Sequence, residues 1–321
     1  MTGPGWNTKV AIVGAGAVGS TIGYALLIRG VADRVVLYDL DGSKVRAEVL
    51  DLRHGLQFVP HAEVVGGDDV AVCEGADVVV ITAGAKQKPG QSRLDLAGAN
   101  VAMCATLVPQ LVEVAGDGVF LMVTNPVDVV TYAAVRMAEL PPGRVFGSGT
   151  VLDSSRLRYL LARHLGVAVQ NVHAWVAGEH GDSELPLWSS ASVGTIPLDK
   201  FALPGRSPLD EETRSQIATE VVTSAEQVIR GKGATNYAIG LAASRIVEAV
   251  LRNQNHVMPV CTMLHRYQGL DALDDVCLSV PCVVNRRGAE AVLDVPLSKE
   301  EEARLVASAE AVRAAARSLG L

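Results

Sequence analysis

Residues 9–19 are KVAIVGAGAVG, a β-rich run followed by the pattern Gly14-x-Gly16-x-x-Gly19. An unbroken apolar run of this length suits a strand that is buried on both faces, as in a parallel sheet. The apolar stretch 20–28 that follows has the character of a helix. A strand, a glycine-rich turn and a helix in this order predict a dinucleotide-binding unit.

The three glycines serve different physical purposes in such a unit. Gly14 permits a tight turn, Gly16 lets a pyrophosphate approach the backbone, and Gly19 lets the helix pack closely on the strand. Asp39 ends the next β-rich run, RVVLY at 34–38, where its carboxylate can accept hydrogen bonds from the adenosine ribose. Because this carboxylate would repel the extra phosphate of NADP, we expect NAD as the cofactor.

β-rich and helical segments alternate from Lys9 to about Phe146, and the alternation then breaks down. Such alternation predicts a parallel sheet with helices on both faces. We therefore expect an α/β protein in which a Rossmann-type, doubly wound domain (1–147) precedes an α+β substrate-binding and catalytic domain (148–321). In the second half we expect one helix that begins near Asp153, two helices between residues 208 and 252, and one helix from about residue 298 to the end. A functional site is expected in the cleft between the two halves.

Composition excludes several classes of protein. The 321 residues are 49% hydrophobic and 20% charged, and the net charge of −7 comes with no basic block, so neither nucleic acid nor a membrane is an expected partner. No signal peptide and no apolar run of about 18 residues is evident, which favours a cytoplasmic location. The cysteines form no C-x-x-C pair or metal-ligand cluster, so we expect buried free thiols and no metal: Cys73, Cys104, Cys261, Cys277 and Cys282.

The stretch VAGEHGDS at 176–183 places His180 between two glycines. Taken alone, it is typical of a surface turn. An imidazole has an ordinary pKa of about 6.5 and therefore also suits proton transfer near neutral pH. In VLDSSRLR (151–158), Asp153 could orient that imidazole, and Arg156 would share its helix face three residues later. A guanidinium can bind a carboxylate through two parallel hydrogen bonds, although these two residues could also form a simple surface ion pair.

Further polar residues occur in a fixed order: Gln87 and Arg93 in GAKQKPGQSRLDL, Asn125 in VTNPVD, and Thr235 in KGATNY. Together with the motifs above, this set resembles the NAD-dependent lactate and malate dehydrogenase family over nearly the whole chain. The likeness is greatest to the bacterial, effector-regulated lactate dehydrogenases. It implies a reversible hydride transfer between NADH and a 2-keto acid, with His180, Asp153, Arg93 and Arg156 as the catalytic residues.

The resemblance also assigns the remaining site residues. Arg93 would swing in to polarise the substrate carbonyl, although it could be a solvated arginine at a helix start. Asn125 would hydrogen-bond the substrate or the nicotinamide ribose, although Asn-Pro is also a common turn. Thr235 would form the pocket wall near the substrate methyl. Val18 and Gly84 would contact the cofactor.

Gln87 bears on substrate choice, because malate dehydrogenases have an arginine at this position. A neutral glutamine leaves the second carboxylate of oxaloacetate unpaired in a closed site, at a cost of several kcal/mol. Pyruvate and L-lactate are therefore the expected substrates. Lys86 and Lys88 flank Gln87 and keep open a malate dehydrogenase or another L-2-hydroxy acid dehydrogenase. A non-catalytic NAD-binding relative is the alternative from another functional class.

Arg158 and His173 match positions that bind fructose 1,6-bisphosphate in the regulated bacterial enzymes. The resemblance implies a site shared between subunits, so that the effector favours a homotetramer. Without the resemblance, Arg158 could be a solvated helix residue, and His173 could be a strand residue that faces a neighbour.

Overall fold

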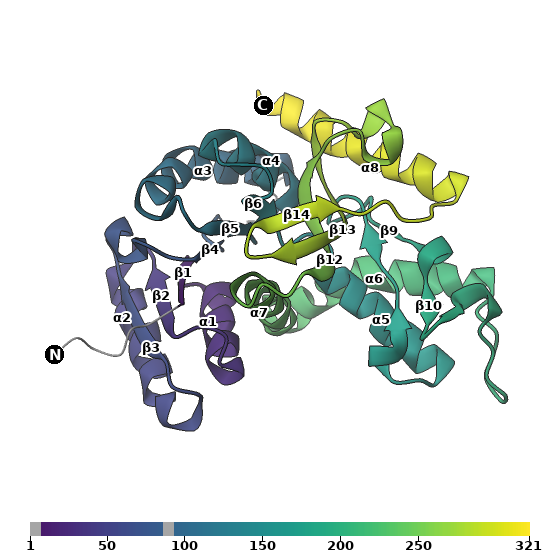
Figure 1. The fold of residues 1–321 in the computed structure, drawn as a ribbon, viewed down its shortest axis with the longest axis horizontal. Helices are drawn as coiled ribbons and strands as arrows, with labels where there is room; N and C mark the ends of the chain where they lie inside the picture. Colours follow the sequence, from purple (N-terminus) through teal and green to yellow (C-terminus); the bar gives the residue numbers. More distant parts are fainter. Residues whose placement is uncertain (1–7, 86–92) are drawn as a thin grey trace.

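The computed structural model describes residues 8–85 and 93–321, and its centre is a nine-stranded sheet (Figure 1). The strand order is β14-β13-β12-β6-β5-β4-β1-β2-β3. The parallel part consists of β1 (Lys9–Val13), β2 (Arg34–Tyr38), β3 (Glu63–Gly67), β4 (Val78–Ile81), β5 (Val119–Met122) and β6 (Val145–Gly147). This order confirms the doubly wound, Rossmann-type sheet that the alternating sequence predicts.

Strand β1 is buried on both faces, as its composition indicates. Val10 and Ile12 belong to one hydrophobic core, whereas Ala11 and Val13 belong to another on the opposite face of the sheet. Helices cover both faces, because every crossover between parallel strands must pass over the sheet. The helices of this half are α1 (Ala17–Arg29), α2 (Gly42–His54), α3 (Arg93–Ala115) and α4 (Val127–Ala138).

The second half mixes helices with antiparallel strands, which confirms the expected α+β character. Its helices are α5 (Val151–Leu165), α6 (Glu211–Lys232), α7 (Tyr237–Leu251) and α8 (Lys299–Ser318). Two small sheets are formed by β7 (Val172–His173), β10 (Ser192–Val193) and β11 (Ile196–Pro197), and by β8 (Val176–Ala177) and β9 (Leu185–Pro186). Short 3-10 turns cover Leu56–Phe58, Val70–Cys73, Val169–Asn171, Trp188–Ser190, Leu198–Lys200, Tyr267–Gly269 and Asp271–Leu273.

Three long strands of the second half extend the first sheet and do not form a separate one. They are β12 (His256–Leu264), β13 (Val276–Asn285) and β14 (Gly288–Val292). β12 pairs antiparallel with β6 through Cys261 and Gly147. This pairing covers the edge of β6, whose backbone groups would otherwise be left without partners. The two halves of the chain therefore share one continuous sheet.

Helix α3 is long and apolar enough, by length and composition, to cross a membrane. Its residues Cys104, Val108 and Leu111 are fully buried in the core beside Phe120 and Met122 of β5. Packing against the sheet therefore accounts for the buried third of its apolar window. All five cysteines are buried free thiols, as expected from the sequence.

Candidate active site

His180 lies on a loop that follows β8 and is held to the rest of the fold through its backbone. The N–H of His180 donates a hydrogen bond of 2.7 Å to Oδ2 of Asp128, in the first turn of α4. The N–H of Glu179 donates one of 2.8 Å to Oγ of Ser308 in α8. Gly178 has a φ of +94°, and a Cβ there would lie 2.8 Å from the same Ser308 Oγ. The turn of the VAGEHGDS motif is thus packed into the protein and not free on its surface.

The side chain of His180 forms a close pair with Asp153. Nδ1 of the imidazole lies 2.6 Å from Oδ2 of Asp153, which is 0% exposed. The other carboxylate oxygen of Asp153 accepts a 2.6 Å hydrogen bond from Nη1 of Arg156. The structure therefore joins the imidazole and the guanidinium through one buried carboxylate, as the spacing of Asp153 and Arg156 on α5 suggests.

The pKa values of this pair diverge from their ordinary values. Burial alone would lower the pKa of His180, but the charge and hydrogen bond of Asp153 outweigh it and, with Glu184, raise it well above 6.5. Burial would raise the pKa of Asp153, yet His180 and then Arg156 hold it below its ordinary value. The imidazolium form of His180 is thus favoured, which suits a proton donor.

The ion pair between Arg156 and Asp153 exists, but it is not a surface pair. The Arg156 side chain is mostly buried, and its Nη1 also approaches the carbonyl oxygen of Val221 in α6 at 3.5 Å. These contacts fix the guanidinium beside the imidazole, where it can bind an anionic ligand.

Two buried acids near His180 are not among the residues that the sequence singled out. Asp128 is 1% exposed, and burial raises its pKa to about 6. Glu184 lies 3.8 Å from Nδ1 of His180, and burial raises its pKa to about 7. Asp128 could have been noticed as a lone carboxylate in the apolar run VDVVTYAAV, and Glu184 as an acid four residues after the histidine.

Asp153, His180 and Glu184 also form a group whose donor atoms lie within 4.8 Å of one another. A metal ion would require one nitrogen and two carboxylate oxygens that are free to bind it. Here the Nδ1 of His180 and both oxygens of Asp153 are engaged with each other and with Arg156. The arrangement is therefore explained by an acid–base pair without a metal ion.

The glycine-rich turn fits a dinucleotide. Gly14 has a φ of +103°, and a Cβ there would lie 2.6 Å from the backbone nitrogen of Ala83. A Cβ on Gly19 would lie 1.9 Å from the carbonyl oxygen of Gly14. A Cβ on Gly16, in contrast, would meet only Lys44 Nζ at 3.9 Å, so a phosphate can approach the backbone there. The half-buried Val18 packs against the core from the first turn of α1.

Asp39 connects the second strand to this turn. Its Oδ2 accepts a 2.8 Å hydrogen bond from the N–H of Ala15, and its Oδ1 accepts one of 3.2 Å from the N–H of Asp41. The carboxylate therefore lies beside the glycine turn, at the end of β2. This is the position from which it can reach the ribose of a bound dinucleotide.

The ends of β4 and β5 bring Gly84 and Asn125 to the same edge of the sheet. Asn100 links their segments through two hydrogen bonds. Its Oδ1 accepts one of 2.8 Å from the N–H of Ala85, and its Nδ2 donates one of 2.7 Å to the carbonyl of Asn125. A Cβ on Gly84 would lie 2.5 Å from Cγ2 of Thr124. The carboxyl ends of parallel strands form the usual ligand-binding edge of an open sheet.

The remaining predicted residues are placed less completely. Gln87 lies outside the described residues, together with Lys86 and Lys88. The backbone of Arg93 begins α3. Thr235 lies between α6 and α7, and the next residue, Asn236, donates a hydrogen bond of 3.0 Å to Thr21 of α1. The Thr235 segment is thereby tied to the helix that follows the glycine turn.

Arg158 and His173 lie on neighbouring elements, α5 and β7. Nε of Arg158 donates a 2.9 Å hydrogen bond to the carbonyl of Ala174, the residue after His173. The guanidinium carbon lies 4.3 Å from the centre of the Trp175 ring. His173 itself is exposed.

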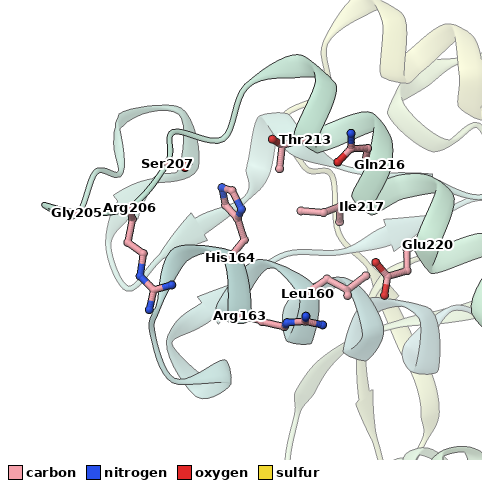
Figure 2. Close-up of a pocket in the computed structure, with 10 residues that line it drawn as sticks. All are labelled: Leu160, Arg163, His164, Gly205, Arg206, Ser207, Thr213, Gln216, Ile217 and Glu220. Atoms are coloured by element: carbon pink, nitrogen blue, oxygen red, sulfur yellow. The ribbon is translucent and has the colours of Figure 1, made fainter.

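A separate cavity of about 470 Å³ lies between α5, α6 and the segment 205–207 (Figure 2). Figure 2 shows the imidazole of His164 between Arg206 on one side and Thr213 and Ile217 of α6 on the other. Of the site residues assigned by the resemblance, none whose side chain the structure describes lines this cavity.

Comparison with known proteins agrees with this geometry. Residues 8–147 match the model of the lactate/malate dehydrogenase NAD-binding domain, and residues 150–318 match that of the family's α/β C-terminal domain. An L-lactate dehydrogenase of Bifidobacterium animalis subsp. lactis is 50% identical over 98% of this chain and 97% of its own length. One from Gloeobacter violaceus is 46% identical over 95% of this chain and 91% of its own length.

Two solved structures share the whole fold. A lactate dehydrogenase from a Medee basin deep-sea metagenome library superposes with a TM-score of 0.93 at 35% identity, covering 98% of this chain and 100% of its own. The ligand-bound minor L-lactate dehydrogenase from Enterococcus mundtii superposes with a TM-score of 0.92 at 36% identity, covering 97% and 98%.

Proposed function

The chain belongs to the lactate/malate dehydrogenase family, its activity is that of an NAD-dependent L-lactate dehydrogenase, and we propose which residues perform the reaction and what regulates it. The observation that carries the residue assignment is the position of Asp153 between His180 and Arg156. One carboxylate thereby fixes the distance between a proton donor and an anion clamp. We assign the cofactor-binding part to residues 1–147 and the substrate-binding part to residues 148–321.

The proton step belongs to His180. Asp153 holds Nδ1 and supports the imidazolium, so that Nε2 can donate its proton to the keto oxygen of pyruvate. Arg156 binds the pyruvate carboxylate through parallel hydrogen bonds. NADH, when bound, supplies the hydride. In the reverse direction, the neutral imidazole accepts the hydroxyl proton of L-lactate.

Other residues orient and select the substrate in this proposal. Arg93 polarises the keto group, Asn125 hydrogen-bonds the substrate or the nicotinamide ribose, and Thr235 contacts the substrate methyl. Gln87 is neutral where malate dehydrogenases have an arginine, so oxaloacetate is disfavoured.

Steady-state rates with pyruvate and oxaloacetate test this selectivity. We expect kcat/KM for pyruvate to be at least about a hundredfold higher, as one unpaired carboxylate implies. Equal values would favour a malate or broader L-2-hydroxy acid dehydrogenase. A His180→Asn variant distinguishes an enzyme from a non-catalytic relative, because the enzyme loses turnover while it still binds NADH.

NAD is the cofactor, and we assign its contacts to Gly14, Gly16, Val18, Gly19, Asp39, Gly84 and Asn125. Asp39 is the residue that would exclude NADP. Replacing Asp39 by Ser should therefore reduce the preference for NADH over NADPH by about tenfold or more, measured as the ratio of kcat/KM values. A ratio equal to that of the wild type would contradict this assignment.

We also propose that fructose 1,6-bisphosphate activates the enzyme through Arg158 and His173. Arg158 is oriented by Ala174 and Trp175. The pKa of His256 is lowered by burial and then by Arg245 and Arg158, whereas Glu248, which pairs with Arg245, opposes this shift. Cationic groups therefore outnumber this acid on this side of α5. Such a cluster favours a bisphosphate, and a ligand shared between subunits would favour a homotetramer.

Pyruvate saturation curves at pH 6, with and without the bisphosphate, test the effector site. We expect a lower KM with the effector in the wild type and no change in Arg158→Gln. A wild-type curve that the bisphosphate leaves unchanged would contradict the site. The buried free thiols are consistent with the cytoplasmic location that we propose.

A further inference from the structure

Glu184 is a buried acid beside the catalytic pair that the mechanism above does not use. It lies four residues after His180 and directly before β9, and its side chain is 2% exposed. Its Oε2 lies 3.8 Å from Nδ1 of His180, the same nitrogen that Asp153 contacts at 2.6 Å. Its Oε1 is buried and has no hydrogen-bond partner among the described residues. A carboxyl group in this setting requires a physical explanation.

The charges around Glu184 determine its protonation. His180, Asp153 and Arg156 are the charged groups that chiefly act on it. Asp128 of α4 is bonded to the backbone of the same loop and also interacts with the charge of His180. Arg156 is already bonded to Asp153, so two carboxylates share one imidazolium. Burial, followed by the negative charge of Asp153, favours the protonated acid, whereas the imidazolium of His180 at 3.8 Å and then Arg156 favour the carboxylate. Glu184 therefore changes protonation near neutral pH, in step with His180.

We propose that Glu184 is a positioning residue that widens the pH range over which His180 can act as a proton donor. When His180 is an imidazolium, Glu184 is a carboxylate that stabilises it from the side of Nδ1. When the imidazole is neutral, Glu184 is protonated. This inference rests on the proposed function, because it concerns the same histidine.

The protons balance through the cycle. During pyruvate reduction, His180 gives its Nε2 proton to the substrate oxygen and becomes neutral. The neutral ring is then flanked by the carboxylates of Asp153 and Glu184. Glu184 takes one proton from solvent, which removes one of the two negative charges. Before the next reduction, Glu184 releases this proton and His180 takes one up at Nε2, so that each reduction consumes one proton from solvent. During lactate oxidation, His180 accepts the hydroxyl proton, and Glu184 releases its proton to solvent.

The pH profile of kcat/KM for pyruvate tests the proposal in a Glu184→Gln variant. Glutamine has the shape of the protonated acid but cannot ionise, so the pKa of His180 should fall. The alkaline limb of the profile should therefore move to lower pH by about one unit or more, as expected for the loss of a charge within about 4–6 Å. A limb at the wild-type position, or a rate that falls equally at every pH, would overturn the proposal. The second outcome would indicate a purely structural role.

Glu179→Gln is a matched control on the same loop. Oε2 of Glu179 accepts a hydrogen bond from Oγ of Ser183, whereas the groups that chiefly raise the pKa of His180 are Asp153 and Glu184. Its removal should move the alkaline limb by much less than the removal of Glu184. Equal shifts in both variants would overturn the specific role of Glu184.

A measurement on the wild-type protein keeps the test independent of turnover and of variant folding. In the NADH complex labelled with ¹³C at glutamate side-chain carboxyls, one signal should titrate near pH 7. The same signal should titrate at higher pH in His180→Asn, because the imidazolium charge that lowers its pKa is lost. The absence of any glutamate signal titrating above about pH 6 would overturn the inference. A wild-type protein that fails to reduce pyruvate would instead refute the proposed function and leave this titration intact.

Discussion

Oδ2 of Asp128 accepts a hydrogen bond of 2.7 Å from the backbone N–H of His180, across 52 positions of the chain. Asp128 lies in the first turn of α4, three residues after Asn125. The loop that carries the proton donor is thereby fixed to the segment that we assign to the substrate and nicotinamide. The other oxygen of Asp128 is buried without a hydrogen-bond partner in the described part of the chain.

This contact predicts how stability depends on pH. Burial raises the pKa of Asp128 to about 6, above the ordinary value of 3.8, so the folded state binds this proton more tightly than the unfolded state. Ionisation of Asp128 therefore lowers the free energy of unfolding as the pH rises through about 6. In an Asp128→Asn variant, the amide oxygen could still accept from the His180 N–H, and the side chain would not ionise. We expect this variant to exceed the wild type in stability at pH 8 by about 1–3 kcal/mol.

Urea unfolding at pH 8 and pH 5 checks this prediction. The difference in free energy of unfolding between Asp128→Asn and the wild type should narrow as the pH falls below about 6, because the wild-type carboxyl is then protonated. Asp128→Ala serves as the contrasting variant, since it loses the acceptor as well as the charge and should be less stable than Asp128→Asn at both pH values. A difference that is the same at both pH values would contradict the assignment.

The Asp153–His180 pair predicts a second pH effect. Without the carboxylate, the imidazolium of His180 loses its main source of stabilisation, so the pKa of His180 should fall. Asp153→Asn should lower kcat for pyruvate reduction by about a hundredfold or more and move the alkaline limb to lower pH. The Kd for NADH, measured by fluorescence, should stay within a fewfold of the wild type. Asp199→Asn, on an exposed turn, is the control, and a full rate in Asp153→Asn would refute the proton step.

Arg156 should act through its geometry as well as its charge. In Arg156→Lys the positive charge remains, but the two parallel hydrogen bonds to the substrate carboxylate are lost. We expect kcat/KM for pyruvate to fall by about a hundredfold, mostly through a higher KM, with NADH binding unchanged. Arg163→Lys on the same helix is exposed and should behave as the wild type. Similar kinetics in both variants would mean that Arg156 does not bind the substrate.

Two glycines of the first turn should have different effects when replaced: Gly16 should affect cofactor binding, and Gly19 should affect folding. A Cβ on Gly16 makes only an ordinary contact with Lys44 Nζ, so Gly16→Ala should retain the wild-type Tm while its Kd for NADH rises by about tenfold or more. A Cβ on Gly19 would overlap the carbonyl of Gly14, so Gly19→Ala should lower the Tm even without cofactor. Thermal unfolding and NADH titration measure both. An unchanged Kd in Gly16→Ala would argue against pyrophosphate binding at this turn.

The sequence predicts most of the first half of the fold because its signals are local. In KVAIVGAGAVG, strand composition, turn glycines and helix start all lie within one short segment, residues 9–19, and Asp39 follows at the end of the next strand. The C-terminal helix carries its own start signal, since Ser298 and Glu301 form a capping box. The spacing of Asp153 and Arg156 likewise places both on one helical face. The roles of Gln87 and Arg93 rest on the resemblance alone.

The surroundings of the imidazole depend instead on contacts between distant segments. Asp153 is 27 positions from His180 and Asp128 is 52 away, and no local pattern specifies that α4, α5 and the histidine loop converge. The extension of the parallel sheet by β12 also depends on a long-range pairing, between Cys261 and Gly147. Burial decides the protonation of Glu184, and burial results from the packing of distant segments, whereas strand, turn and helix signals arise from neighbouring residues.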